Sequence, residues 1–321
     1  MCGIIGYSGP KEPLPILING LSRLEYRGYD SAGIAISDGN KITVEKKEGK
    51  LEVLKNHLKD NNIKGNIGIG HTRWATHGVP NDVNAHPHSD NNEEFAIIHN
   101  GIIENYAEIK KDLLEEGFEF KSDTGTEVVA VELSRKWNGE LLKTVTDVAK
   151  TLEGTYALVV TTTKEEGTIV AGRLMSPLVL GVGENEVFLA SDSAAILEHT
   201  NKMIFLENGD FVEIKNGQYK LFDSELNEIE REIQEIDWEV SEAEKLGYDH
   251  FMYKEILEQS EVIERTISGR LETTSKEIPI KQDEASKYEK IWIVACGTAY
   301  HAGKQYRCLL YTSDAADDRR W

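Results

Sequence analysis

The chain begins with Met1-Cys2-Gly3-Ile4-Ile5-Gly6, an apolar run with a cysteine near its head. The turn-prone Ser8-Gly9-Pro10 follows, so the sequence predicts a short buried strand that anchors Cys2 in a sheet. Removal of Met1 would place an α-amine with a pKa near ~7.7 beside a thiol with a pKa near ~8.5 on one residue. A base next to a nucleophile suits acyl transfer. The alternative is that Met1 stays and that Cys2 is incidental.

Length and composition set broad limits on the class of protein. The 321 residues suffice for two domains, or for one large domain and part of another. Hydrophobic residues make up 40% and charged residues 29% of the chain, as in ordinary globular proteins. No apolar run reaches the roughly 18 residues of a membrane span, and the N-terminus lacks the pattern of a signal peptide. We therefore expect a cytoplasmic protein.

The cysteines and histidines indicate a free thiol rather than a disulfide or a metal site. Cys2, Cys296 and Cys308 are widely spaced and form no CxxC motif. His86 and His88 have no cysteine or carboxylate nearby at a spacing that suits metal binding, so we expect no metal. The formal net charge of −20 opposes binding to nucleic acid or to an anionic membrane, although solubility alone also explains it.

Apolar periodicity predicts an α+β arrangement over the first two thirds of the chain. Residues 74–92 lack such a period and are expected to form a long loop, of a kind that is often functional. Elsewhere we expect strands at 34–37, 42–46, 67–69 and 95–98, helices at 14–24, 50–61 and 106–116 and up to about 152, and β-rich runs from 156 to 222. This order predicts two packed sheets that carry helical layers.

The last third of the chain has a different character. Residues 223–245 are strongly acidic, as at a domain boundary, and a helix is expected at 250–270 before a polar linker at 272–289. A continuous apolar strand at 290–295 then leads into Cys296-Gly297-Thr298-Ala299. A small-residue turn that opens a helix presents backbone N–H groups to an anion such as a phosphate.

Acyl transfer from an amide needs a nucleophile, a base, donors for the developing oxyanion and a group that holds the substrate. Asn100-Gly101, directly after a buried strand, offers a side-chain amide and a backbone N–H as such donors, although the pair also suits a simple turn. Arg73 can bind a carboxylate through two parallel hydrogen bonds, and Thr76 and His77 lie on the same loop. A surface position is the alternative for this arginine.

Four segments together resemble the glutaminase domain of class II glutamine amidotransferases, and within that group the glutamine:fructose-6-phosphate aminotransferase (isomerising) family. The similarity extends from Met1 to about Gln305 and includes residues 248–256 and the turn at 295–298, which opens a sugar isomerase domain. The four segments are Met1-Cys2-Gly3-Ile4-Ile5-Gly6, Leu24-Glu25-Tyr26-Arg27-Gly28-Tyr29-Asp30-Ser31-Ala32-Gly33, His71-Thr72-Arg73-Trp74-Ala75-Thr76-His77-Gly78 and His99-Asn100-Gly101-Ile102-Ile103-Glu104-Asn105.

The resemblance implies a four-layer αββα N-terminal-nucleophile hydrolase fold, followed by a truncated fragment of an α/β sugar isomerase domain. It implies that Cys2 attacks the side-chain amide of glutamine, that its own amine is the base, and that Asn100 and Gly101 form the oxyanion hole. Arg73, Thr76 and His77 would hold the backbone groups of glutamine. No cofactor is implied.

The resemblance also implies three supporting roles. Arg27 would support the surroundings of the nucleophile, and Trp74 would gate the passage of ammonia to the second domain. Thr298 matches a residue that contacts the sugar phosphate. The alternative to a gating role is that Trp74 belongs to the hydrophobic core.

One position departs from the family pattern. That pattern is Ser-x-Thr-Asp-Thr-Glu, whose Asp receives the α-amino group of glutamine, whereas this chain reads Ser122-Asp123-Thr124-Gly125-Thr126-Glu127. Gly125 supplies no carboxylate, and Asp123 would substitute only if the backbone shifted. We therefore predict weakened binding of glutamine.

These patterns divide the chain into a glutaminase domain at 1–222, an acidic linker at 223–247, the incomplete start of a sugar isomerase domain at 248–306 and a non-family tail at 307–321. We expect such a chain to hydrolyse glutamine but not to make glucosamine 6-phosphate. Use of fructose 6-phosphate and assembly as a homodimer are expected of a full-length parent only.

Two further interpretations remain open at this stage. In the first, the same glutaminase chemistry serves another acceptor, as in relatives of amidophosphoribosyltransferase or asparagine synthetase; the segment after Gly247 and the Cys296-Gly297-Thr298 turn argue against it. In the second, the chain is a non-catalytic binding or regulatory module, which Gly125 and the short second domain would fit.

Overall fold

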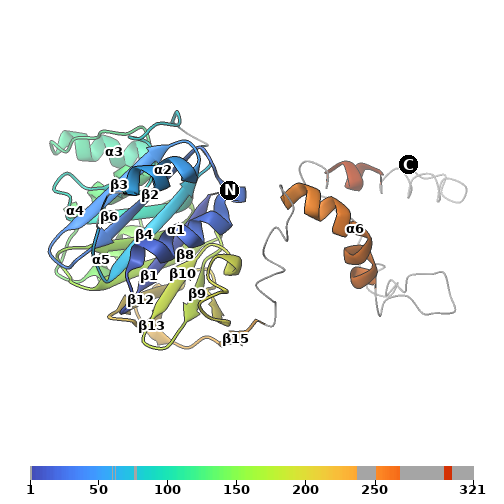
Figure 1. Cartoon of the computed structure of the whole chain (residues 1–321). Helices are drawn as coiled ribbons and strands as arrows, with labels where there is room; N and C mark the ends of the chain where they lie inside the picture. The colour runs from blue at the N-terminus through green and yellow to red at the C-terminus, as the bar shows by residue number, and fades with distance from the viewer. Residues whose placement is uncertain are drawn as a thin grey trace, which may run out of the picture. The chain divides into compact units, whose positions relative to one another are not determined.

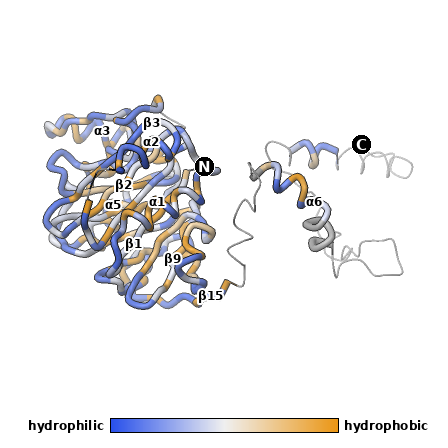
Figure 2. Tube along the Cα trace, viewed as in Figure 1, coloured by the Kyte–Doolittle hydropathy of each residue, from blue (hydrophilic) through white to orange (hydrophobic). Residues whose placement is uncertain are grey.

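A computed structural model of the chain describes residues 2–59, 61, 63–75, 78–236, 251–267 and 300–305. The chain divides into two compact units, Met1–Phe251 and Met252–Trp321, which are taken separately here. The first unit contains two β-sheets and the helices that cover them (Figure 1). Its hydrophobic stretches run mostly along the strands inside, and its hydrophilic stretches lie mostly on the outside (Figure 2).

The first sheet has eight strands and contains β1 near its middle. β1 pairs antiparallel with β10 on one side and with β4 on the other, so that Ile5 lies opposite Ala190 and Gly70. The order across the sheet is β15 (Gln234–Glu235), β11 (Lys202–Phe205), β9 (Val179–Val182), β10 (Val187–Ala190), β1 (Gly3–Ser8), β4 (Ile67–Arg73), β2 (Ser31–Ser37) and β3 (Ile42–Glu48). The predicted anchoring of Cys2 by a buried strand is confirmed, because Cys2 directly precedes β1.

The second sheet has seven strands, all paired antiparallel. The long strand β6 holds Asn100 and Gly101 opposite Ala157 and Tyr156 of its neighbour. The order is β14 (Glu228–Ile229), β13 (Gln218–Phe222), β12 (Phe211–Lys215), β8 (Thr168–Leu174), β7 (Gly154–Thr162), β6 (Phe95–Ile103) and β5 (His88–Ser89). Strand β5 falls inside the segment 74–92, which was expected to be a loop throughout.

Alternation along the strands divides the core into layers. Ile4 and Ile98 point into the space between the two sheets and belong to one shared hydrophobic cluster. Their neighbours Ile5 and Ile97 point to the opposite faces, where they pack beneath helices. Because each sheet buries both of its faces, the unit has the two packed sheets with helical layers that the residue pattern predicted, in the four-layer αββα arrangement that the resemblance implied.

Helices α1 (Pro13–Leu24) and α2 (Leu51–Leu58) cover the first sheet, and α4 (Gly125–Arg135) and α5 (Leu141–Ala149) cover the second. Helix α3 (Tyr106–Glu115) packs on α4 (Figure 1). Contact between α1 and β1 depends on Gly20, because a Cβ there would lie 2.8 Å from Cδ1 of Ile5. The helices predicted at 14–24, 50–61 and 106–116 are therefore confirmed, with boundaries that shift by up to three residues.

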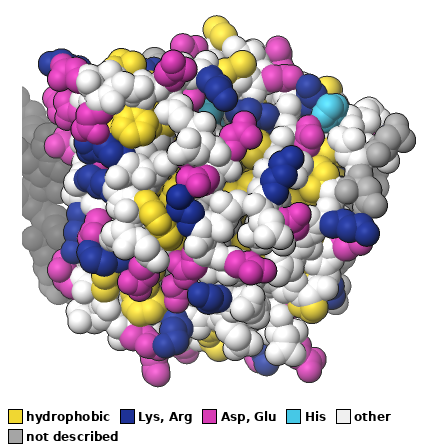
Figure 3. Space-filling model, turned by 90° about the vertical axis from the view of Figure 1, so that its left-hand side faces the viewer, with side chains coloured by type: hydrophobic (Ala, Val, Ile, Leu, Met, Phe, Trp, Pro, Cys, Tyr) yellow, Lys and Arg dark blue, Asp and Glu magenta, His cyan; other side chains and the backbone are white. Residues whose placement is uncertain are grey.

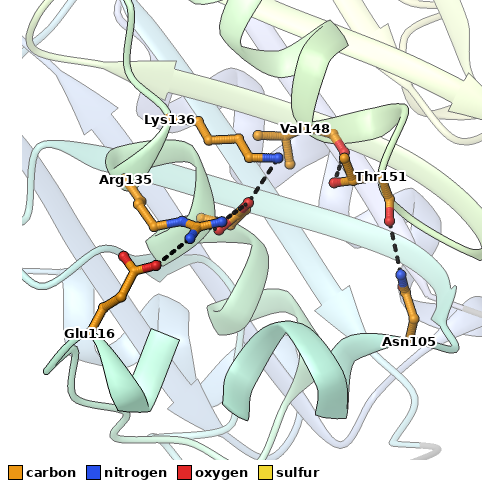
Figure 4. Close-up of polar contacts among 7 residues, drawn as sticks. Asn105, Glu116, Arg135, Lys136, Val148 and Thr151 are labelled. Atoms are coloured by element: carbon orange, nitrogen blue, oxygen red, sulfur yellow. Dashed lines mark hydrogen bonds and ion pairs between the residues drawn. The ribbon is translucent and has the colours of Figure 1, made fainter. Parts of the chain in front are cut away.

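Ion pairs fix the C-terminal end of α4 (Figure 4). The Glu132 side chain is almost completely buried and binds Arg135 Nε at 2.8 Å and Lys136 Nζ at 3.0 Å. Arg135 also reaches Glu116, just after α3, at 2.6 Å. On the opposite side of the same layer, Asn105 Nδ2 donates to the backbone oxygen of Thr151 at 2.8 Å. These contacts join the helices that cover the second sheet.

The acidic segment that was expected to be a linker begins inside the fold. Strand β14 pairs with β13 and strand β15 pairs with β11, so both sheets continue past the expected boundary at residue 222.

On the face drawn in Figure 3, Asp and Glu side chains alternate with Lys and Arg side chains, so that no extended patch of one charge forms there.

In the second unit the structure describes helix α6 (Phe251–Ile267), apart from its first residue, and a helical stretch at 300–305. Helix α6 confirms the helix predicted at 250–270. The predicted strand at 290–295, the turn with Cys296 and Thr298, and the segment 307–321 lie outside the described residues. None of the helices in the described ranges is both long enough and apolar enough to cross a membrane.

Candidate active site

Cys2 lies at the mouth of a cavity between the ends of the two sheets. Its Sγ accepts a hydrogen bond from the backbone N–H of Trp74 at 3.2 Å, just beyond the end of β4. Burial raises the pKa of the Cys2 thiol, and the Trp74 N–H partly offsets this increase. A thiol in this position therefore needs a base before it can act as a nucleophile.

Arg73 ends strand β4 and lines the same cavity. Its side chain faces the space between the sheets, since it alternates with Ile69 and His71 on that face of β4. Only 4% of Arg73 is exposed, and its Nη2 donates to the backbone oxygen of Gly78 at 3.2 Å. Among the described residues that line the cavity, Arg73 is the single permanent charge and no side chain is acidic.

Asn100 and Gly101 approach Cys2 from the second sheet. Asn100 Nδ2 donates to the backbone oxygen of Cys2 at 3.1 Å, and Gly101 lines the cavity. Gly101 has a φ of 128°, and a Cβ there would lie 2.0 Å from the backbone oxygen of Thr155, so this strand position requires glycine. The structure therefore brings together the candidate nucleophile and the two candidate oxyanion donors, which are nearly one hundred positions apart in the sequence.

The N-terminal end of α4 closes one side of the cavity through Thr124, Gly125 and Thr126. Thr124 caps the helix, because its side chain accepts a hydrogen bond from the Glu127 N–H. A Cβ on Gly125 would lie 3.1 Å from Cβ of Tyr106, so a side chain fits there only if Tyr106 yields slightly. Position 125 thus faces the cavity without contributing a charge.

Asp123 does not line this cavity. Its Oδ2 accepts a hydrogen bond from Asn84 Nδ2 at 3.1 Å, and its N–H donates to Asn84 Oδ1 at 2.9 Å. It borders two neighbouring hollows, one of which it shares with Tyr29 and Trp74. The structure therefore places Asp123 outside the cavity that Cys2, Arg73 and Gly101 line, in a hollow that it shares with Trp74.

Trp74 and Arg27 occupy the surroundings of Cys2. Trp74 is 46% exposed, which excludes the alternative of a core position, and its ring meets that of Tyr29 edge to face. Arg27 Nη1 binds Asp192 Oδ2 at 2.9 Å, next to Ser191, whose hydroxyl accepts from the Ile4 N–H. Arg27 thus acts on the strand behind Cys2 and does not line the cavity.

Four buried histidines form a group at the cavity, where His86 and His99 belong to the lining, and no pattern in the sequence predicts this group. The rings of His71 and His86 stack at 4.3 Å between centroids, and those of His86 and His88 meet edge to face at 4.8 Å. The Thr126 hydroxyl lies within hydrogen-bond distance of both His86 Nε2 and His99 Nδ1. Burial lowers the pKa of every ring, to about 3 for His71 and to about 4 for His99, so all four are neutral near pH 7.

Asp30 is a second residue that the sequence analysis did not assign to the site. Its N–H donates to the backbone oxygen of Arg73 at 3.2 Å, and its Oδ2 accepts a hydrogen bond from the Ala75 N–H. Its charge also raises the pKa of the Cys2 thiol. The available signal was the segment from Leu24 to Gly33, which carries the resemblance described above and contains Asp30.

Lys46 holds the long loop that follows Trp74. Its Nζ donates to the backbone oxygens of Val83, Ala85 and Pro87 at 3.1, 2.7 and 3.1 Å. Burial lowers the pKa of Lys46 to about 8. Three carbonyls around one ammonium group fix this part of the loop, whereas Thr76 and His77 lie outside the described residues.

In the described ranges, no group of three or more His, Cys, Asp or Glu side chains is arranged to hold a metal ion.

Several curated proteins with similar sequences carry one and the same name. A glutamine--fructose-6-phosphate aminotransferase [isomerizing] from Clostridium perfringens is 50% identical over 94% of this chain and 50% of its own length. Proteins with the same name from Fusobacterium nucleatum and Thermus thermophilus are 49% and 45% identical, over 95% and 97% of this chain and 51% and 52% of their own lengths. The chain thus spans about half the length of the curated relatives it matches.

Solved structures share the fold of the first unit. The glutamine phosphoribosylpyrophosphate amidotransferase from B. subtilis, complexed with ADP and GMP, matches with a TM-score of 0.62 and 28% identity over 71% of this chain and 50% of its own. This likeness identifies the four layers as an N-terminal-nucleophile hydrolase fold. The sequence profile of the glutamine amidotransferase domain matches residues 55–263, which is more than half of the chain. The chain therefore belongs to the glutamine amidotransferase domain family.

Proposed function

We propose that this chain hydrolyses the side-chain amide of L-glutamine to glutamate and ammonia, with Cys2 as the nucleophile. The observation that carries the proposal is the meeting of Cys2, Arg73 and Gly101 around one cavity, with the Asn100 amide bonded to Cys2. A free thiol of this kind fits a reducing compartment such as the cytoplasm. The described residues around the cavity supply the proposed chemistry without a cofactor.

The mechanism starts with removal of Met1, which frees the α-amine of Cys2. This amine takes the proton of the buried thiol, and the sulfur attacks the amide carbon of glutamine. The carbonyl oxygen becomes an oxyanion that accepts hydrogen bonds from Asn100 Nδ2 and from the Gly101 N–H. The C–N bond then breaks, the amine returns its proton to the leaving nitrogen, and water hydrolyses the resulting thioester to glutamate.

Recognition of the substrate rests mainly on Arg73. Its guanidinium binds the α-carboxylate of glutamine through two parallel hydrogen bonds, and Thr76 and His77 are proposed to assist from the same loop. No described side chain in the cavity offers a carboxylate to the α-ammonium group, because Gly125 stands at the helix start and Asp123 is bonded to Asn84. We therefore propose that glutamine binds more weakly here than in a cavity with an acidic side chain at position 125.

The complete protein is proposed to use the ammonia to make glucosamine 6-phosphate from fructose 6-phosphate, because the relatives carry the name of that reaction. Trp74 would gate the passage of ammonia, Arg27 would support the strand of Cys2, and Thr298 would contact the sugar phosphate. Residues 248–306 would begin the sugar isomerase domain, and the complete protein would form a homodimer.

The proposal is tested by three measurements on the purified chain. Intact mass should show the loss of Met1, incubation with glutamine should release glutamate, and a diazo ketone analogue of glutamine should add once to Cys2 and abolish activity. Cys2→Ala is the matched control, because it keeps the strand but removes the sulfur, and it should neither label nor release glutamate. Retention of Met1 in an active preparation would show that the mechanism is wrong. Absence of both label and glutamate would favour the non-catalytic alternative.

A further inference from the structure

His71 is a fully buried side chain that contacts both sheets. It lies on β4 opposite Ile4 of β1 and Gly33 of β2, and none of its surface is exposed. Its Nε2 is 3.0 Å from Oδ1 of Asn100 and 3.1 Å from the backbone oxygen of His99. One ring nitrogen therefore faces two oxygens on the strand that supplies the oxyanion donors.

The backbone oxygen settles which nitrogen of His71 carries the proton. A peptide carbonyl only accepts hydrogen bonds, so the nitrogen that faces it must be the Nε2–H. The Nδ1 atom is buried and has no hydrogen-bond partner within the described part of the chain. A bare lone pair is less costly in such a place than an unpartnered N–H, so this arrangement also favours the Nε2–H tautomer.

The same N–H then settles the orientation of the Asn100 amide. A donor at Nε2 requires the amide oxygen on its side, which directs Nδ2 of Asn100 to the other side, where it lies 3.1 Å from the backbone oxygen of Cys2. A flipped amide would place two donors face to face at His71 and would present an oxygen to Cys2. An oxygen in that position would repel the oxyanion that the reaction forms.

We propose that His71 is a positioning residue for glutamine hydrolysis, because its Nε2–H holds the Asn100 amide with the nitrogen directed toward Cys2. This inference rests on the function proposed above. His71 touches neither the substrate nor the reacting atoms, and it acts only through Asn100. The groups that surround it are suited to keep the ring in place: His86 stacks on it, and His99 supplies the carbonyl.

A matched pair of variants tests the role. His71→Gln keeps an N–H close to the position of Nε2, whereas His71→Met has a similar length and no donor. We expect His71→Met to lower kcat on the order of 10²-fold, as for the loss of one oxyanion donor, with a change in KM below about 2-fold. The kcat of His71→Gln should be at least about 10-fold higher than that of His71→Met. Equal losses in the two variants would overturn the proposal, because they would indicate a packing role.

A double-mutant cycle separates action through Asn100 from a general effect on the fold. In the Asn100→Ala background, His71→Met should lower kcat by less than about 2-fold, since the amide that it orients is already absent. A further loss as large as that in the wild-type background would contradict the proposal. Thermal unfolding of each variant shows whether it is folded under the conditions of the assay.

The tautomer provides a readout that does not depend on catalysis. Nitrogen spectra of protein labelled with ¹⁵N-histidine distinguish a protonated Nε2 from a protonated Nδ1, and loss of a signal in His71→Gln assigns it. We expect the Nε2–H form at neutral pH. The Nδ1–H form would overturn the inference even if the chain hydrolyses glutamine, whereas the Nε2–H form in a chain without glutaminase activity would indicate that the proposed function has failed.

Discussion

The two ends of helix α4 use opposite kinds of polar contact. At the N-terminal end, Thr124 and Thr126 bind neutral, buried histidines, two of which line the cavity. At the C-terminal end, Glu132 is almost completely buried but ionic, and it binds Arg135 and Lys136 (Figure 4). The side of the helix that faces the cavity therefore begins in hydroxyl and neutral imidazole groups, with the Glu127 carboxylate bonded to Ser122 outside the cavity lining, whereas the far end carries a charged cluster.

This difference between the two ends leaves the positive charge of Arg73 available to bind the substrate. With the buried histidines neutral and no acidic side chain present, Arg73 is the single permanent charge among the described residues around the cavity. A carboxylate that enters meets no competing anion in the lining, and its attraction to Arg73 is strengthened because that side chain is buried. The C-terminal cluster binds no ligand in this scheme, so its charges neutralise one another and fix the helix.

Among the variants at the cavity, beside the neutral end of α4, Asn100→Ala is expected to lower activity most. It removes the donor beside Cys2 and should lower kcat on the order of 10²–10³-fold, or ~2.7–4 kcal/mol, without a comparable change in the free energy of unfolding. Steady-state release of glutamate measures the loss. A variant with normal kcat would show that the Asn100 amide is no oxyanion donor, and that the neutral network serves stability alone.

Acid should lower the free energy of unfolding through the buried histidines of the neutral end. The pKa of His99 is lowered to about 4 in the folded protein, against 6.5 as its ordinary value, so between these values the unfolded chain binds more protons. The free energy of unfolding should therefore be highest above about pH 6.5 and fall toward pH 4 by roughly 1.4 kcal/mol per pH unit for each such histidine. Urea unfolding across this range measures the slope, and His99→Gln should make it shallower. A flat profile would show that these rings are not buried neutral.

Glu132→Ala should weaken the charged end and spare the cavity. It leaves Arg135 and Lys136 without their shared carboxylate, but both cations are about one third exposed, so water partly replaces the lost contact. We expect the free energy of unfolding to fall by about 1–3 kcal/mol, with kcat and KM for glutamine within about 2-fold of wild type. Lys143→Ala, which breaks an exposed pair with Asp147, is the matched control and should change stability by less than about 0.5 kcal/mol. A large loss of kcat in Glu132→Ala would show that the two ends are coupled.

Gly125→Asp sharpens the comparison by adding one charge to the neutral end. A carboxylate in the first turn of α4 would pair with the α-ammonium group of glutamine and would also be favoured by the helix dipole. We expect KM for glutamine to fall by about 10-fold, or ~1.4 kcal/mol. For a substrate analogue of glutamine that lacks the α-amino group, KM should not fall. Gly125→Asn controls for the bulk beside Tyr106. An unchanged KM for glutamine would mean that the cavity already binds the ammonium group by other means.

Much of the fold followed from local patterns. The apolar spacing of 14–24 predicted α1 correctly, and the continuous apolar run at 95–98 predicted β6, because the helix buries one face and the strand buries both. The strand β5 and the strands β14 and β15 were not predicted, since each has only two residues and is held by pairing with a neighbour rather than by its own sequence. Segments this short carry no periodicity from which a strand can be recognised.

The site was predictable where a residue type carries chemistry by itself. Cys2, Arg73 and the Asn100-Gly101 pair were recognised, and the structure brings them together. Their catalytic and binding roles remain predictions, as do those of Arg27, Trp74 and Thr298. His71 was overlooked as a site residue because a histidine on a strand has no local mark of its tautomer or partners.

The sequence by itself determined which side chains are available and which strands carry them, because nucleophilicity, charge and strand periodicity are properties of residues and of their immediate neighbours. Only the tertiary structure decided that the amide of Asn100 faces Cys2, that Asp123 turns to Asn84 and that four histidines are neutral. The physical reason is that a hydrogen-bond orientation or a buried pKa depends on atoms from distant segments, whose meeting is a property of the packed sheets and not of any one stretch of chain.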